Sequence, residues 1–301
     1  MKFGLHLTVS PRHYREIASL AEEVGFDTIY VPEHLVLPSE MPALYPYSDD
    51  GLPRLSGLGD ITPSTPCYDP WAQLGFVAAC TSTVRLATAV AVVPLYHPLF
   101  LARSLATLDR LSGGRVTLGG GVGWLKSEFD WAGRSFHDRG RRTDVIIDLL
   151  RRFWAEDVVE HHDEHFDLGP LQFNPKPLQK PGIPIELGGS SPAALRRVGR
   201  LGDGWLEFGA RDLDEVVAQL AVVDEERRRA ERTELPFEVT SWLPVIDDVD
   251  RVRRAEDAGI DRIATSPTVA NGTPLTPDVF RTWAFALRDR MSSLESSGLT
   301  S

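Results

Sequence analysis

The segment 184–205 contains the residues of this chain best suited to hold an anion. The glycine pair 188–189 carries no side chains, the serine pair 190–191 offers hydroxyl groups and an N-cap, and Pro192 suits the first position of a helix. A helix that begins at Ala193 leaves several N–H groups unpaired in a positive field, and a phosphate requires such donors. On these features alone, an ordinary strand-to-helix turn with a good cap is an equal alternative.

A histidine and a glutamate, His34 and Glu33, directly follow a short apolar stretch at 28–31. A histidine at a strand end can donate a proton or hydrogen-bond a reduced ring, although a partly buried polar residue is the more common role. Two further stretches, the apolar 89–93 and the glycine-dense LGGGVGW at 118–124, could let a flat ligand approach the backbone. The glycines of 118–124 do not form a GxGxxG motif, which argues against a Rossmann site.

Three histidines, His161, His162 and His165, lie among acidic residues and invite a metal hypothesis. Their segment alternates in the manner of a β-hairpin, which would place His161 and His165 on one face and His162 on the other. A solvated hairpin is therefore the favoured interpretation, and we expect no metal site. The chain also has no GxSxG or HExxH motif, so hydrolysis through those routes is unsupported.

Composition narrows the class of protein further. The chain has 301 residues, 42% of them hydrophobic, and a formal net charge of -11 with no long basic run, which argues against a nucleic-acid partner. The two cysteines, Cys67 and Cys80, form neither a disulfide framework nor a metal motif. The N-terminal apolar stretch is too short for a signal sequence, and no apolar run reaches membrane-spanning length. We expect a cytoplasmic protein without membrane contact.

Short apolar strands alternate with longer helical patterns from end to end. Eight such units fit a (β/α)₈ TIM barrel better than a doubly wound sheet, which would usually stop near six strands. We expect an inserted hairpin after the fourth helix, within 158–177, and a long loop after the second strand, at 35–66. The expected strands are 2–9, 28–31, 85–93, 115–121, 185–188, 204–208, 237–245 and 262–265, and the expected helices are 11–24, 68–80, 99–111, 141–154, 192–201, 212–232, 248–258 and 277–291.

The chain contains no linker that would separate two domains. We therefore expect one barrel domain at 1–291 and a flexible C-terminal tail at 292–301. In such a barrel the active site lies at the C-terminal ends of the strands, where both the 184–205 turn and His34 fall.

Taken together, the strand-end motifs resemble those of the luciferase-like monooxygenase superfamily, and in particular its coenzyme F420-dependent oxidoreductase branch. The matching pieces are VPEHLVLP at 31–38, the run from TAVAVVP to GGGVGW at 88–124, and the run from NPKPLQKP to GDGW at 174–205. The resemblance implies a TIM barrel with a deazaflavin or flavin lying across its mouth. It also implies a catalytic role for His34 near the redox centre of the ring, with Glu33 as its acidic neighbour.

The resemblance further implies which residues contact the cofactor. It places the phosphate at the turn before the fifth expected helix and a non-proline cis peptide, Ala89–Val90, behind the ring. Trp124 is included although it stands where the sugar-phosphate dehydrogenase members carry an acidic glutamate. The implied cofactor-contacting residues are Ala89, Val90, Val92, Val122, Gly123, Trp124, Ser127, Gly189, Ser190, Ser191, Ala193 and Ala194.

The replacement of the glutamate by Trp124 leaves the acid-base assignment open. Glu128 could take its place only if the loop turns inward, and Arg211 is a weaker hint of a substrate phosphate site. Basic residues near the mouth would favour the polyglutamate tail of F420, and the candidates are Lys126, Arg54 and Arg211. The loop 35–66, with Tyr45, Tyr47 and Arg54, is a candidate lid that excludes water.

We therefore expect an F420-dependent oxidoreductase that moves a hydride between the deazaflavin and a small organic substrate. One alternative is an FMN-dependent monooxygenase that uses reduced flavin and O₂. A second is a flavin- or deazaflavin-binding protein without chemistry. The expected partner is a small-molecule substrate, with neither nucleic acid nor membrane, and a homodimer is left open.

Overall fold

Eight parallel strands close into a barrel, which confirms the predicted (β/α)₈ fold. The computed structural model describes residues 1–42, 44–48, 51, 53–55, 59–244, 248–267 and 275–297. Each barrel strand pairs in parallel with its neighbours, and the pairing of β7 with β10 closes the ring. In spatial order the strands are β1 (Lys2–His6), β2 (Thr28–Val31), β5 (Arg85–Thr88), β7 (Val116–Gly121), β10 (Ile185–Gly188), β11 (Gly204–Glu207), β12 (Glu238–Ser241) and β13 (Arg262–Thr265).

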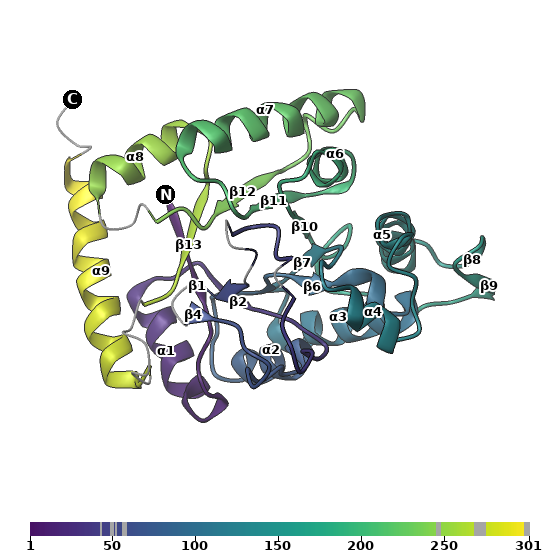
Figure 1. Cartoon of the computed structure of the whole chain (residues 1–301), viewed down its shortest axis with the longest axis horizontal. Helices are drawn as coiled ribbons and strands as arrows, with labels where there is room; N and C mark the ends of the chain where they lie inside the picture. Colours follow the sequence, from purple (N-terminus) through teal and green to yellow (C-terminus); the bar gives the residue numbers. More distant parts are fainter. Residues whose placement is uncertain are drawn as a thin grey trace.

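Helices cover the outside of the barrel, with α7, α8 and α9 along its C-terminal half (Figure 1). Their apolar faces pack on the strands and form the large core between the two layers. The helices are α1 (Tyr14–Val24), α2 (Pro70–Ala78), α3 (Pro98–Ser112), α4 (Lys126–Trp131), α5 (Arg139–Ala155), α6 (Pro192–Leu201), α7 (Leu213–Arg229), α8 (Val249–Asp257) and α9 (Pro277–Ser297), with 3₁₀ turns at Pro11–His13 and Val93–Leu95.

The expected strand 85–93 is interrupted at its predicted special bond. The peptide Ala89–Val90 is cis, as the resemblance implied, and it separates β5 from the short β6 (Ala91–Val92). On the neighbouring strand β7, a side chain at Gly119 would place its Cβ 1.7 Å from the Thr88 carbonyl oxygen. Glycine is therefore required where these two strands approach each other.

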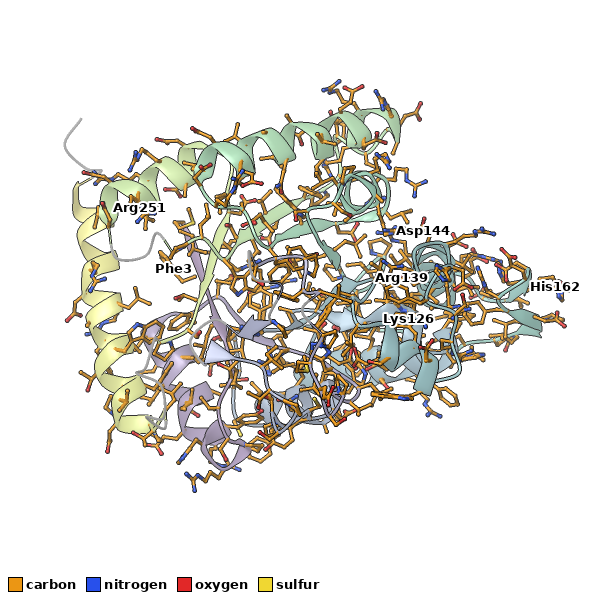
Figure 2. All side chains as sticks on the ribbon, in the orientation of Figure 1. Phe3, Lys126, Arg139, Asp144, His162 and Arg251 are labelled. Carbon is orange, nitrogen blue, oxygen red and sulfur yellow. The ribbon has the colours of Figure 1, made fainter. Side chains whose placement is uncertain are left out.

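A short antiparallel pair, β8 (Val159–His162) with β9 (Asp167–Leu171), follows α5 in the stretch where alternation predicted a hairpin. It extends outward beyond α5, and His162 lies at its outer end (Figures 1 and 2). The His162 ring pairs with Glu160 and Asp167. Within the described residues, no group of three or more His, Cys, Asp or Glu side chains is arranged to hold a metal ion.

Several element ends differ from the expected ones. The first strand stops at His6 rather than at residue 9, and the last helix continues to Ser297, past residue 291. The expected end of the strand 237–245, Val245, and the last four residues, 298–301, lie outside the described residues, as do parts of the 35–66 loop. None of the helices within the described ranges has a run long and apolar enough to cross a membrane.

Candidate active site

A cavity of about 840 Å³ opens at the C-terminal ends of the strands. It falls within the size range of ligand pockets. Two predicted site residues do not border it: Ser127, whose hydroxyl is buried without a hydrogen-bond partner, and Ala193, which is exposed on the first turn of α6. The predicted residues that do border it are Glu33, His34, Ala89, Val90, Val92, Val122, Gly123, Trp124, Gly189, Ser190, Ser191 and Ala194.

The turn between β10 and α6 has the geometry of an anion site. The Ser191 hydroxyl caps the helix by accepting the Ala194 N–H at 3.2 Å, and Trp205 Nε1 fixes the turn by donating to the Gly189 carbonyl at 3.1 Å. Gly189 has φ +121°, and a Cβ at this position would lie 2.9 Å from the Ala194 Cβ. A side chain at Gly189 would thus crowd the cradle in front of the helix N-terminus, where a phosphate would sit.

The carboxylate that contacts His34 is Glu128 and not its sequence neighbour. Glu128 Oε2 lies 3.1 Å from His34 Nδ1, and Glu128 Oε1 accepts the Leu35 N–H at 2.6 Å. The Glu128 side chain is only 1% exposed because α4 turns it inward beneath the loop after β2. The inward turn that the sequence left conditional is therefore present, and the expectation of Glu33 as the acidic neighbour of His34 is corrected.

Glu33 instead holds the backbone behind the cavity. Its carboxylate accepts the Val92 N–H at 2.7 Å and a hydrogen bond from the Tyr96 hydroxyl. Burial raises the pKa of Glu33 to about 7, against the opposing effect of these two donors. Through Val92 this side chain fixes β6, the strand segment that follows the cis peptide.

Aromatic side chains from the loops after β2 and β7 border the mouth of the cavity. The Trp124 ring meets His34 edge-on, at 6.0 Å between centroids and 89° between planes, and it packs against Tyr45 at 5.2 Å. Tyr45 in turn packs on Tyr47 at 5.3 Å, and both tyrosines border the cavity. Trp124 thus forms an apolar wall in the position where the resembling dehydrogenases carry an acid.

The basic residues expected near the mouth are arranged differently from the prediction. Lys126 is exposed and pairs with Asp130, and Arg211, with 82% of its side chain exposed, pairs with Glu215. Neither borders the cavity, and the Arg54 side chain lies outside the described part of the chain.

One basic residue that does border the cavity, Arg139, was not found from the sequence. Arg139 begins α5, near Lys126 and Asp144 in the view of Figure 2. It donates to the Gly123 carbonyl at 3.1 Å, and its guanidinium stacks on Phe136 at 3.8 Å. Its place in the arginine-rich start of that helix gave no signal, since such residues usually form a solvated face.

The fold and the cavity define the class: a (β/α)₈ barrel enzyme with a serine-capped strand-to-helix turn and a part-buried histidine–carboxylate pair at one mouth. The profile described as luciferase-like monooxygenase matches residues 3–256, and the chain belongs to this family. The protein is accordingly an oxidoreductase rather than a binding protein without chemistry.

The chain is also similar to individual proteins. An uncharacterized protein of Mycobacterium tuberculosis, Rv0953c, is 37% identical over 221 residues, which are 71% of this chain and 74% of that protein. An F420-dependent glucose-6-phosphate dehydrogenase of Amycolatopsis mediterranei is 28% identical over 248 residues, 80% of this chain and 63% of its own length.

Solved structures share the fold. The monooxygenase RslO1 from Streptomyces bottropensis superposes with a TM-score of 0.72 at 23% identity, covering 97% of this chain and 99% of its own. An F420-dependent secondary alcohol dehydrogenase, solved with an F420–acetone adduct, gives a TM-score of 0.71 at 18% identity, covering 95% of this chain and 98% of its own.

Proposed function

We propose that the protein is an F420-dependent oxidoreductase that transfers a hydride between the deazaflavin and a small organic substrate. The observation that carries the proposal is that one cavity joins the Ser191-capped turn, the Ala89–Val90 bulge and the His34–Glu128 pair. Relatives named as F420-dependent dehydrogenases support the same cofactor.

The residues present fit a phosphate-bearing, flat cofactor. Besides the cradle at Gly189, a Cβ at Gly121 would lie 2.5 Å from Val90 Cγ2, and a Cβ at Gly188 would lie 3.0 Å from Val90 Cγ1. These glycines leave room for the Val90 side chain, which borders the cavity beside the bulge, so that a ring could pack against Val90. When bound, F420 supplies a carbon centre that accepts or donates a hydride.

The protein's own groups would manage the proton. Because His34 Nδ1 is hydrogen-bonded to Glu128, Nε2 is the ring nitrogen that would exchange a proton with a substrate oxygen. In alcohol oxidation the hydroxyl proton would pass to His34 while the hydride leaves the carbon. The buried Glu128 carboxylate would stabilise the resulting imidazolium, in the manner of other histidine–carboxylate pairs.

An FMN-dependent monooxygenase is the second candidate, and one observation favours it. Lys126 and Arg211, two of the three residues expected to hold an F420 tail, do not border the cavity. The fold shared with the monooxygenase RslO1 is compatible with this candidate.

A parallel titration of the purified protein with F420 and with FMN tests the proposal. We expect F420 to bind at least tenfold more tightly than FMN, and we expect His34→Asn to retain F420 affinity while losing hydride transfer. Tighter binding of FMN would transfer the proposal to the monooxygenase. Equal turnover by wild type and His34→Asn across pH would remove the proton-transfer role.

A further inference from the structure

The cavity has two chemically different ends. The turn proposed to hold the phosphate lies at β10 and α6, and Arg139 borders the cavity near the end of β7, the strand that pairs with β10. The opposite end lies across the barrel, where β1 ends and where α1 and α2 begin. The residues that border this second end, called here the β1 end, are Leu7, Thr8, Val9, Ser10, Tyr14, Tyr68 and Gln73.

The β1 end contains no charged side chain among the described residues that form it. Over the whole described lining, the aspartate, glutamate, lysine and arginine residues are limited to Glu33 and Arg139. Arg139 lies at the other end, where it bonds the Gly123 carbonyl. Glu33 supplies no positive charge in either protonation state, so it offers an anion no favourable partner.

The polar groups of the β1 end are neutral and largely buried. Tyr14 is 3% exposed and Gln73 is 7% exposed. The Tyr14 hydroxyl donates to Gln73 Oε1, and Gln73 Nε2 donates to the Tyr68 carbonyl at 3.1 Å. Burial raises the pKa of Tyr14 and keeps its hydroxyl protonated. The lone pairs on Tyr14 Oη and the second N–H of Gln73 remain to bind one hydroxyl or carbonyl group.

We propose that the β1 end selects an uncharged, mainly apolar alcohol or ketone as substrate and rejects phosphorylated ones; this rests on the proposed hydride transfer. A phosphate buried here would lose its water without gaining a cation, which is strongly unfavourable. The aromatic wall of Trp124 and Tyr45 adds apolar surface beside His34. In this respect the protein would differ from the relatives named as glucose-6-phosphate dehydrogenases.

Three probes with one carbon skeleton test the proposal: 1-phenylethanol, 1-phenylethyl phosphate and 1-phenylethylamine. Each is titrated by calorimetry into the free protein and into the protein saturated with F420. We expect the alcohol to bind at least tenfold more tightly than the phosphate ester and the amine. Equal or tighter binding of either charged probe, or no measurable binding of the alcohol, would overturn the proposal.

A positive charge added at the β1 end should weaken the preference for the alcohol over the phosphate ester. Ser10 is exposed and borders the β1 end, so Ser10→Lys should fold and should narrow the alcohol-to-phosphate affinity ratio at least fivefold. Val217→Lys, on α7 and away from the cavity, adds the same charge and should leave the ratio unchanged. An unchanged ratio in Ser10→Lys would show that the probes do not occupy the β1 end.

The two proposals fail separately in this design. Absence of F420 binding contradicts the proposed function, while the probe ratio in the free protein still reports on the β1 end. F420 binding combined with a preference for the phosphate ester contradicts only the substrate class.

Discussion

At the scale of single residues, two glutamates near the mouth of the cavity make different contacts. Glu128 contacts His34 through its side chain, whereas Glu33 contacts the backbone of Val92 and the hydroxyl of Tyr96. Sequence adjacency pointed to Glu33 as the partner of His34. Successive residues project in different directions from an extended backbone, so the neighbour in sequence faced elsewhere.

We expect Glu128→Gln to lower kcat for hydride transfer by about tenfold or more, which is a part of the roughly 10²–10⁴-fold that general acid–base catalysis contributes. Glutamine still accepts the Leu35 N–H but cannot balance an imidazolium charge on His34. Steady-state kinetics across pH measure the effect, with F420 affinity expected within twofold of wild type. The matched control is Glu234→Gln, because Glu234 is exposed and does not border the cavity. An unchanged kcat and pH profile would assign Glu128 a structural role alone.

Glu33→Gln should change how stability depends on pH. Burial raises the pKa of Glu33 from 4.5 to about 7, so its stabilising contribution is present below pH 4.5 and is lost as pH rises through 7. Glutamine imitates the protonated form and does not titrate. The free energy of unfolding of the variant relative to wild type should therefore rise by about 2–3 kcal/mol between pH 4.5 and pH 8. Urea denaturation at several pH values measures this difference, and a difference that stays constant with pH would contradict it.

At the scale of elements, the sequence predicted those that carry a strong period or a clear start signal. The helix α6 begins at the Pro192 that follows its serine cap and has its predicted bounds, 192–201, and β2, β10 and β13 also have their predicted bounds. By contrast, α4 was not predicted. It spans only Lys126–Trp131, which is too short to display a helical period, and it follows a glycine-rich strand end. Because α4 carries Glu128, the partner of His34 could not be assigned from sequence.

The cap of α6 provides a test that separates cofactor binding from folding. Aspartate caps helices as well as serine does, so Ser191→Asp should leave the thermal midpoint nearly unchanged. It places a negative charge where the cofactor phosphate would sit, and we expect the affinity for F420 to fall at least tenfold. Ser191→Asn keeps the cap without the charge and should lose much less affinity. Full cofactor affinity in Ser191→Asp would remove the phosphate from this turn.

At the scale of the whole molecule, the eightfold alternation of strand and helix was enough to predict the barrel. It did not predict which side chains meet inside the barrel. The interior layer near the N-terminal ends of the strands is built around Arg262, whose side chain is fully buried. Its guanidinium donates to Asp27 Oδ2 at 2.8 Å and to Glu238 Oε2 at 2.7 Å. These partners are far apart in sequence and meet only through the register of the closed sheet, so no local pattern could reveal them.

Arg262 also reaches across the barrel. Its Nη1 donates to Tyr30 Oη at 3.1 Å and to Thr240 Oγ1 at 2.9 Å, and it lies 3.6 Å from Glu186 Oε1. The group therefore links residues of β2, β10, β12 and β13. Glu186 is buried with its Oε2 unpartnered, and burial raises its pKa to about 7 in spite of the arginine.

Replacing this arginine should destabilise the barrel without altering the cavity at its other end. Arg262→Met leaves the buried Glu186 and the partly exposed Asp27 and Glu238 without their shared cation, and we expect a loss of about 3–5 kcal/mol in the free energy of unfolding at pH 7. Adding Glu186→Gln removes one of the uncompensated charges and should recover part of that loss. Urea denaturation of the two variants measures the stability, and F420 affinity of the folded fraction should match that of wild type. A loss below about 1 kcal/mol would mean that water or a neighbouring proton replaces the arginine, since breaking a buried pair otherwise costs several times more.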